Sequence, residues 1–199
     1  MPPSVVVFDI GGVLVDWHPA LAWADTLGPD AAMAFMERVN FMARNARADA
    51  GVRFTDLATD ITNADDAAQF AAYVGHFSNT VADVVPGVWA IVDRLRARGV
   101  PLHVITNWSA ETWPMALKLH PRLRDSFGVT IVSGVEGVAK PDRRIFELLT
   151  TRAGVAAQEC VFIDDSLSNV DGARLAGMDA IHFTGAAALE TALKNRDLL

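Results

Sequence analysis

The sequence has little of what marks several large classes of protein. A single cysteine among 199 residues excludes an internal disulfide. No apolar run approaches the roughly 20 residues that a membrane-spanning helix needs. The opening stretch, MPPSVVVF, lacks the basic region of a secretory signal. We therefore expect a cytoplasmic protein that does not engage a membrane.

Clustered positive charge is also missing. The chain carries 17 Lys and Arg against 24 Asp and Glu, which gives a formal net charge of -7. A nucleic-acid surface needs clustered Lys and Arg to neutralise phosphates. The sequence therefore argues against nucleic acid as a partner, and it predicts no particular oligomeric state.

What the sequence does contain is a series of short apolar runs rich in Val and Ile. Each run is too short for a stable helix and is typical of a buried parallel strand. The runs are Val5–Phe8, Leu102–Thr106, Val129–Ser133, Cys160–Asp164 and Ala180–Phe183. Helical patterns at Val88–Arg98, Arg143–Arg152 and Asn169–Ala176 separate the later runs. Strands that alternate with helices predict an α/β fold, a doubly wound, Rossmann-like parallel sheet.

One long segment interrupts this alternation. Residues 18–85 show helical patterns without a convincing strand, and Pro86-Gly87 returns the chain to the sheet. We predict a core built from residues 1–17 and 86–199, with a helical insertion, or cap, at 18–85. Asp30 and Asp65 are expected to be helix N-caps. The expected core of the insertion is Phe35, Met36, Val39, Phe41 and Met42.

Polar or small residues follow four of the predicted strands. They are Asp9, Gly11, Gly12, Thr106, Asn107, Lys140, Asp164 and Asp165. Ligands of open parallel sheets bind at the carboxyl ends of the strands. Taken singly, each residue is compatible with an ordinary turn or helix cap. Their placement on successive strand ends predicts one functional site.

The residue types at this site favour phosphate chemistry with Mg²⁺. Carboxylates without His or Cys suit a hard cation that prefers oxygen ligands. A lysine and a threonine hydroxyl beside the metal suit a phosphate, and glycines allow backbone N–H groups to approach it closely. A carboxylate such as Asp9 can attack phosphorus to give an aspartyl-phosphate. The metal and Lys140 would neutralise the transferring charge.

Four stretches in this order resemble the signature regions of the haloacid dehalogenase (HAD) superfamily of aspartate-nucleophile hydrolases. They are FDIGGVLVD, VITNWS, GVAKPD and VFIDDSLSNVDGA. The resemblance covers nearly the whole chain. It is to the phosphatase branch with a helical cap after the first strand, which includes a bacterial glucose-1-phosphate phosphatase. It implies a Mg²⁺-dependent hydrolase of small phosphorylated metabolites, such as sugar phosphates.

The resemblance also implies a role for each site residue. Asp9 would be the nucleophile and Lys140 a second catalytic residue. The phosphoryl group would be held by Gly11, Gly12, Thr106, Asn107 and Lys140. The Mg²⁺ ligands would be Asp9, the backbone carbonyl of Gly11, Asp165 and, directly or through water, Asp164. Ser166 and Asn169 would brace the metal site.

Gly11 departs from the family pattern. Many phosphatases of the superfamily carry a second aspartate at this position, which protonates the leaving group and then activates water. General acid–base catalysis typically contributes about 10²–10⁴-fold. We therefore expect slow turnover and a preference for good leaving groups. His18 is a conceivable substitute, and a surface residue at the cap hinge is the simpler interpretation.

Two alternative functions remain open. A 2-haloacid dehalogenase uses the same aspartate to attack carbon and needs no metal. Asp164 and Asp165 disfavour it, because adjacent carboxylates facing Asp9 would repel one another without a cation. A catalytically degenerate binding protein is the second alternative, supported only by the glycine at position 11.

The substrate depends on the insertion, whose sequence is less informative. Arg47 in the stretch NARADAG, or Arg44 directly before it, could hold an anionic substrate if it faced the cleft. A solvated helix face is the simpler interpretation of both. Trp17, Trp23 and Trp108 could line a substrate site, and core packing explains Trp23 equally well.

Overall fold

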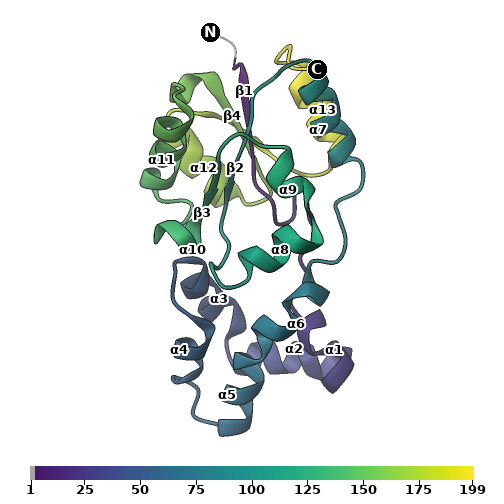
Figure 1. The fold of residues 1–199 in the computed structure, drawn as a ribbon, viewed down its shortest axis with the longest axis vertical. Helices are drawn as coiled ribbons and strands as arrows, with labels where there is room; N and C mark the ends of the chain where they lie inside the picture. Colours follow the sequence, from purple (N-terminus) through teal and green to yellow (C-terminus); the bar gives the residue numbers. More distant parts are fainter. Residues whose placement is uncertain (1–2) are drawn as a thin grey trace.

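The computed structural model describes residues 3–199 and contains a five-stranded parallel sheet in the order β3-β2-β1-β4-β5 (Figure 1). The strands are β1 (Val5–Phe8), β2 (Leu102–Thr106), β3 (Thr130–Val132), β4 (Cys160–Asp164) and β5 (Asp179–His182). The predicted α/β fold is confirmed. Three strands have the predicted bounds, whereas β3 is shorter at both ends and β5 begins and ends one residue earlier.

Alternate residues of the central strand pack into separate cores on the two faces of the sheet. Val6 and Phe8 contribute to one core, and Val5 and Val7 contribute to the other. The first face is covered by α7 (Val88–Ala97) and α13 (Ala186–Lys194), and the second by α11 (Arg143–Ala153) and α12 (Leu167–Leu175). Because both faces are covered, the strands are mostly apolar, and this explains why the sequence pattern predicted them.

Short helices complete the core and connect its strands. They are α8 (Trp113–Leu119), α9 (Arg122–Asp125), α10 (Ser133–Glu136) and the 3-10 helix η1 (Ala157–Glu159). The single cysteine, Cys160, is buried, and burial raises the pKa of its thiol to about 11. Among residues 3–199, no helix is long and apolar enough to cross a membrane.

The insertion between β1 and β2 forms a separate helical body below the carboxyl ends of the strands (Figure 1). Its helices are α1 (Leu21–Leu27), α2 (Pro29–Arg38), α3 (Phe41–Asp49), α4 (Phe54–Ala58), α5 (Ala64–Ala71) and α6 (Tyr73–Thr80). Aromatic rings fill its centre, where Trp23 lies 4.9 Å from Phe35 and 5.3 Å from Phe41 between ring centroids. Of the predicted apolar series only Met42 is exposed. The helical insertion is confirmed, and its limits at residues 18 and 85 stay a prediction.

The predicted N-caps at Asp30 and Asp65 are wrong. Helix α2 begins at Pro29, and Gly28 is its cap. The cap of α5 is Asn63, whose side chain accepts a hydrogen bond from the backbone N–H of Asp66. Asp30 and Asp65 lie in the first turns instead, where a negative charge interacts favourably with the helix dipole.

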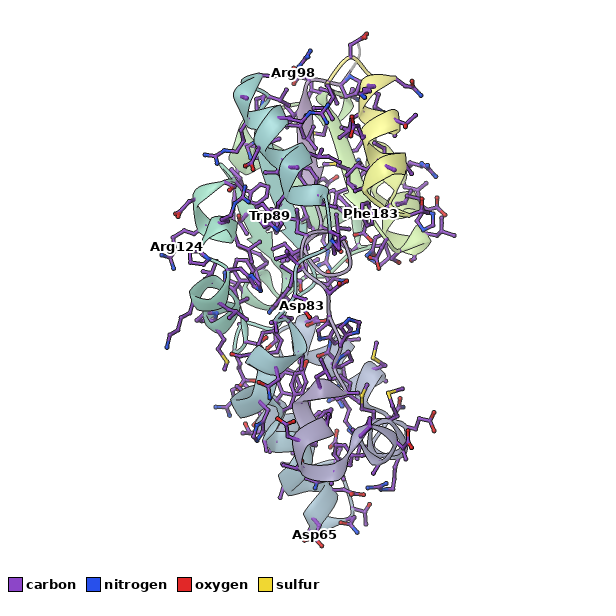
Figure 2. The ribbon with its side chains drawn as sticks, turned by 90° about the vertical axis from the view of Figure 1, so that its right-hand side faces the viewer. Asp65, Asp83, Trp89, Arg98, Arg124 and Phe183 are labelled. Carbon is purple, nitrogen blue, oxygen red and sulfur yellow. The ribbon has the colours of Figure 1, made fainter. Side chains whose placement is uncertain are left out.

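The two chain segments that join the insertion to the core are paired with each other. Val15 and Val84 form an antiparallel bridge, and the N–H of His18 donates to the carbonyl of Thr80 at 2.8 Å. Figure 2 shows Asp83 at the waist between the two bodies and Asp65 at the far tip of the insertion. The hinge is therefore a two-stranded ribbon.

Two glycines inside helices give a matched test of packing at the core. A Cβ added to Gly172 in α12 would lie 2.7 Å from the carbonyl oxygen of Pro141, whereas one added to Gly75 in α6 would meet nothing within 4 Å. We expect Gly172→Ala to lower the free energy of unfolding by about 1–3 kcal/mol through overpacking. Gly75→Ala should raise it by up to about 1 kcal/mol, because alanine is the better helix former. Urea unfolding of both variants measures the difference, and equal effects would contradict this account of Gly172.

Candidate active site

Lys140, in the loop between α10 and α11, connects the ends of three strands. Its Nζ lies 2.8 Å from Oδ1 of Asp9 and 2.7 Å from Oδ2 of Asp164, and it donates to the carbonyl of Ile105 at 3.1 Å. The ammonium side chain is fully buried. Predicted site residues from β1, β4 and the loop after α10 therefore meet at the carboxyl edge of the sheet.

Asp9 is held in one orientation at the end of β1. The backbone N–H of Ile10 donates to its Oδ1 at 2.7 Å, and Lys140 donates to the same oxygen. Burial raises the pKa of the Asp9 carboxyl, and Asp164 adds to the rise, while the Lys140 ammonium opposes it. A second cation beside Asp9 would strengthen the ionised form.

Asp164, at the end of β4, is fully buried and hydrogen-bonded through both carboxylate oxygens. Its Oδ1 accepts from the backbone N–H of Ser166 at 2.8 Å, and Asn169 Nδ2 lies 3.0 and 3.1 Å from the two oxygens. With Lys140 on Oδ2, this network fixes the carboxylate and supplies the hydrogen bonds that a buried charge requires.

Asp9, Asp164 and Asp165 form a site that fits Mg²⁺. One carboxylate oxygen of each lies within 4.8 Å of the others. Three carboxylates face one ammonium, so two negative charges are in excess at this edge of the sheet. A set of oxygen donors with this excess matches a hard divalent cation, which would relieve the repulsion.

Gly12 makes room for the metal-site carboxylate. A Cβ at this position would lie 2.5 Å from Oδ2 of Asp165, and its φ of +72° is one that glycine adopts readily. Its N–H donates to the carbonyl of Val15 at 2.9 Å. This donor is therefore used within the turn, and the phosphate-binding role predicted for Gly12 stays a prediction.

Thr106 and Asn107, at the end of β2, differ in what they contact. Thr106 is buried, and its hydroxyl has no hydrogen-bond partner within residues 3–199. An unpaired buried hydroxyl is costly, and a phosphate oxygen would pair it. Asn107 donates to the carbonyl of Lys140 at 3.0 Å and accepts from its N–H at 2.8 Å. Its side chain therefore positions the lysine loop.

A cleft of about 60 Å³ lies between the core and the insertion, beside these residues. It is lined by Gly11, Trp17, Asn45, Asp49, Tyr73, Phe77, Asn107, Trp108, Ser109 and Thr112. Trp17 and Trp108 line it as predicted, whereas Trp23 belongs to the core of the insertion. The indole N–H of Trp108 is buried without a partner in the described part of the chain, so this wall holds an unused donor.

The two arginines singled out in α3 do not reach the cleft. Nη1 of Arg44 lies 3.9 Å and Nη1 of Arg47 lies 3.0 Å from Oδ2 of Asp60, and neither arginine lines the cleft. Arg47 is exposed, as expected for a solvated helix face. The Arg44 side chain is only 18% exposed and donates to the carbonyl of Val39 at 2.9 Å, so it is a structural residue of the insertion. His18 is exposed and does not line the cleft either.

Sequence reasoning missed Asp49, the last residue of α3. It lines the cleft, and Nδ2 of Asn45 donates to its Oδ2 at 3.0 Å. Burial raises the pKa of Asp49 to about 7, opposed by the Lys140 ammonium and the backbone N–H of Ser109. The spacing of Asn45 and Asp49, four residues apart on one helix face, was the signal that could have found it.

Comparison with known proteins identifies the family. The family model of haloacid dehalogenase-like hydrolases matches residues 3–177 of this chain. The chain is 26% identical over 198 residues to a sesquiterpene phosphatase of Aspergillus oryzae, covering 98% of this chain and 96% of that one. It is 30% identical over 190 residues to a phosphoglycolate phosphatase of Rhodospirillum rubrum, covering 90% and 78%.

Solved structures share the fold at low sequence identity. A HAD family enzyme from Bacteroides thetaiotaomicron, in its magnesium complex, has a TM-score of 0.71 at 18% identity, covering 93% of this chain and 95% of that one. A protein described as a dehalogenase has a TM-score of 0.68 at 20% identity, covering 92% and 85%. Fold alone therefore does not separate phosphatase from dehalogenase. By sequence and fold together, this chain belongs to the haloacid dehalogenase-like hydrolases.

Proposed function

We propose that this chain is a Mg²⁺-dependent phosphatase that hydrolyses small phosphate monoesters of neutral alcohols. The observation that carries the proposal is the arrangement around Lys140, where a fixed Asp9, an unpaired Thr106 hydroxyl and a divalent-cation site converge. The phosphatases of Aspergillus oryzae and Rhodospirillum rubrum support the same reaction class.

Each residue has a defined task in this proposal. Asp9 attacks phosphorus and forms an aspartyl-phosphate, which water then hydrolyses. Lys140 neutralises charge on the transferring group, and the Thr106 hydroxyl donates to one of its oxygens. A Mg²⁺ ion held beside Asp9 and Asp165 would supply further charge neutralisation for the phosphoryl group.

The metal ligands follow from the free oxygens. Asp9, Asp165 and the backbone carbonyl of Gly11 would hold Mg²⁺. Both oxygens of Asp164 are already hydrogen-bonded to the protein, which favours a water-mediated contact for this residue. Asp164 then holds the ammonium group of Lys140, and Asn107 holds its backbone.

The alternatives are less well supported. A 2-haloacid dehalogenase needs no metal, so this function would not explain the excess negative charge at Asp164 and Asp165. A degenerate binding protein does not explain why Asp9, Lys140 and Asp165 are all present. Both remain distinguishable from the phosphatase by simple assays.

The cleft favours a small, uncharged leaving alcohol such as a sugar. About 60 Å³ of space is far below the roughly 300–1,000 Å³ of sites for larger ligands. Aromatic rings line it, and its one charged lining residue among those described is Asp49, an acid. None of the described lining residues is basic, so a carboxylate on the substrate would find no cationic partner there. This lining favours a sugar phosphate such as glucose-1-phosphate over phosphoglycolate, the substrate in the name of the Rhodospirillum rubrum relative.

The first prediction concerns the nucleophile. The wild-type protein should hydrolyse p-nitrophenyl phosphate in the presence of Mg²⁺, and EDTA should abolish this activity. The substitution Asp9→Asn should reduce turnover by at least about 10³-fold. The fold should persist, because Lys140 keeps its ion pair with Asp164. Chloride release from 2-chloropropionate that EDTA does not affect would instead establish the dehalogenase function. Activity retained by purified Asp9→Asn protein would rule out the mechanism.

The second prediction concerns the metal and needs no turnover. A ligand that binds only the folded state stabilises it by about 2.7 kcal/mol at 100 times its Kd, so Mg²⁺ should raise the melting temperature of the wild type by several degrees. Asp165→Asn should remove most of this shift. Asp171→Asn, an exposed acid of α12, is the matched control and should keep it. An equal shift in all three proteins would place the metal elsewhere.

The third prediction concerns the leaving group. Phosphoglycolate and 2-hydroxyethyl phosphate differ mainly in a carboxylate against a hydroxymethyl group. We expect kcat/KM for 2-hydroxyethyl phosphate to be at least about tenfold higher, which corresponds to about 1.4 kcal/mol. Steady-state phosphate release measures both. A preference for phosphoglycolate would contradict the proposed substrate class.

A further inference from the structure

We propose that Asp49, brought to the site by the helical insertion, is the general acid and base that the core lacks at Gly11. The proposal rests on the phosphatase function given above and adds the proton transfers that this function requires. Of the described residues that line the cleft, Asp49 alone carries a carboxyl group.

Gly11 and Asp49 line the same cleft from its two bodies. A Cβ built on Gly11 would meet nothing within 4 Å, so the space above this glycine is open. The core leaves a gap at position 11, and the insertion presents a carboxyl group to the same cleft. A leaving alcohol in that cleft would contact Asp49 while its phosphoryl group faced Asp9.

The position of Asp49 is fixed by hydrogen bonds across the interface. The hydroxyl of Ser133, at the start of α10, donates to the backbone carbonyl of Asp49. Nearby, the N–H of Phe54 donates to Oε2 of Glu111 at 2.7 Å. Asn45 holds the carboxyl itself. A catalytic acid requires this kind of preorganisation, because misplacement by 1 Å weakens proton transfer sharply.

The surroundings of Asp49 suit a group that donates and accepts protons near neutral pH. Lys140 is the charged group from the core that acts on it, and Tyr73 of α6 is a titratable group from the insertion that feels its charge. Burial is the largest influence and sets the pKa of Asp49 to about 7, where an acid–base catalyst is most effective.

The proton transfers balance across the two half-reactions. In the first, an Asp9 oxygen bonds to phosphorus, the bond from phosphorus to the alcohol oxygen breaks, and the Asp49 proton passes to that oxygen. In the second, water oxygen bonds to phosphorus, the aspartyl–phosphorus bond breaks, and the water proton passes to the Asp49 carboxylate. Alcohol and inorganic phosphate leave, and both aspartates return to their initial forms.

Asp49→Asn tests the proposal because the two half-reactions can be observed separately. Nitrophenolate leaves without a proton, so the pre-steady-state burst with p-nitrophenyl phosphate should stay within about threefold of the wild type. Turnover of 2-hydroxyethyl phosphate should fall by about 10²–10⁴-fold. Gly11→Asp, added to Asp49→Asn, should restore at least tenfold of that loss, because the space at position 11 is open.

Asp60→Asn is the matched control, since this exposed carboxylate of the insertion binds Arg47 outside the cleft. It should change neither the burst nor the turnover. Unchanged turnover of 2-hydroxyethyl phosphate in Asp49→Asn would overturn the proposal while the phosphatase function stands. Equal loss of burst and turnover would also overturn it, by showing a structural role. A wild type without phosphatase activity, by contrast, would overturn the proposed function and this inference together.

A measurement on the wild type alone avoids dependence on the folding of any variant. The acid must be protonated to assist a poor leaving group. Turnover of 2-hydroxyethyl phosphate, divided by the burst rate with p-nitrophenyl phosphate, should therefore fall about tenfold per pH unit once the pH exceeds about 7. A ratio that stays constant from pH 6 to 9 would overturn the proposal.

Discussion

The ion pairs of one buried ammonium group organise this molecule. The Lys140 side chain has no exposed surface, and its charge is stabilised chiefly by Asp9 and Asp164, whose oxygens lie within 2.8 Å of Nζ. Its ammonium therefore fixes the relative positions of β1, β4 and the loop after α10. Asn107 fixes the backbone of the same loop. The chemistry at this edge of the sheet therefore depends on the packing that excludes water from Lys140.

The same interaction explains the need for a metal. One ammonium cannot balance three carboxylates, and Asp165 adds its charge at the exposed side of the group. A divalent cation completes the balance that Lys140 begins. The fold therefore supplies two cations of different kinds to the phosphate, one covalently attached and buried, and one exchangeable.

The sheet and most of the site could be predicted from sequence because their signals are local. Buried parallel strands are continuously apolar, and Asp9, Thr106 and Asp164 stand where those runs stop. Other features depend on contacts between distant residues. Asn107 was assigned to the phosphate, yet its amide pairs with a backbone 33 residues away. The spacing of Asn45 and Asp49 marks one face of α3, but that this face lines the cleft depends on how the insertion packs on the core.

The paired hinge ribbon has a consequence for how molecules enter and leave. Val15 and Val84 tie the two crossing segments together, so any movement of the insertion relative to the core would displace both segments at once. The cleft lies on the same side as the hydrogen bonds from Ser133 to Asp49 and from Phe54 to Glu111. Movement of the insertion away from the core would have to break both bonds, so the closed arrangement of the cleft is stabilised from two separate helices of the insertion, α3 and α4.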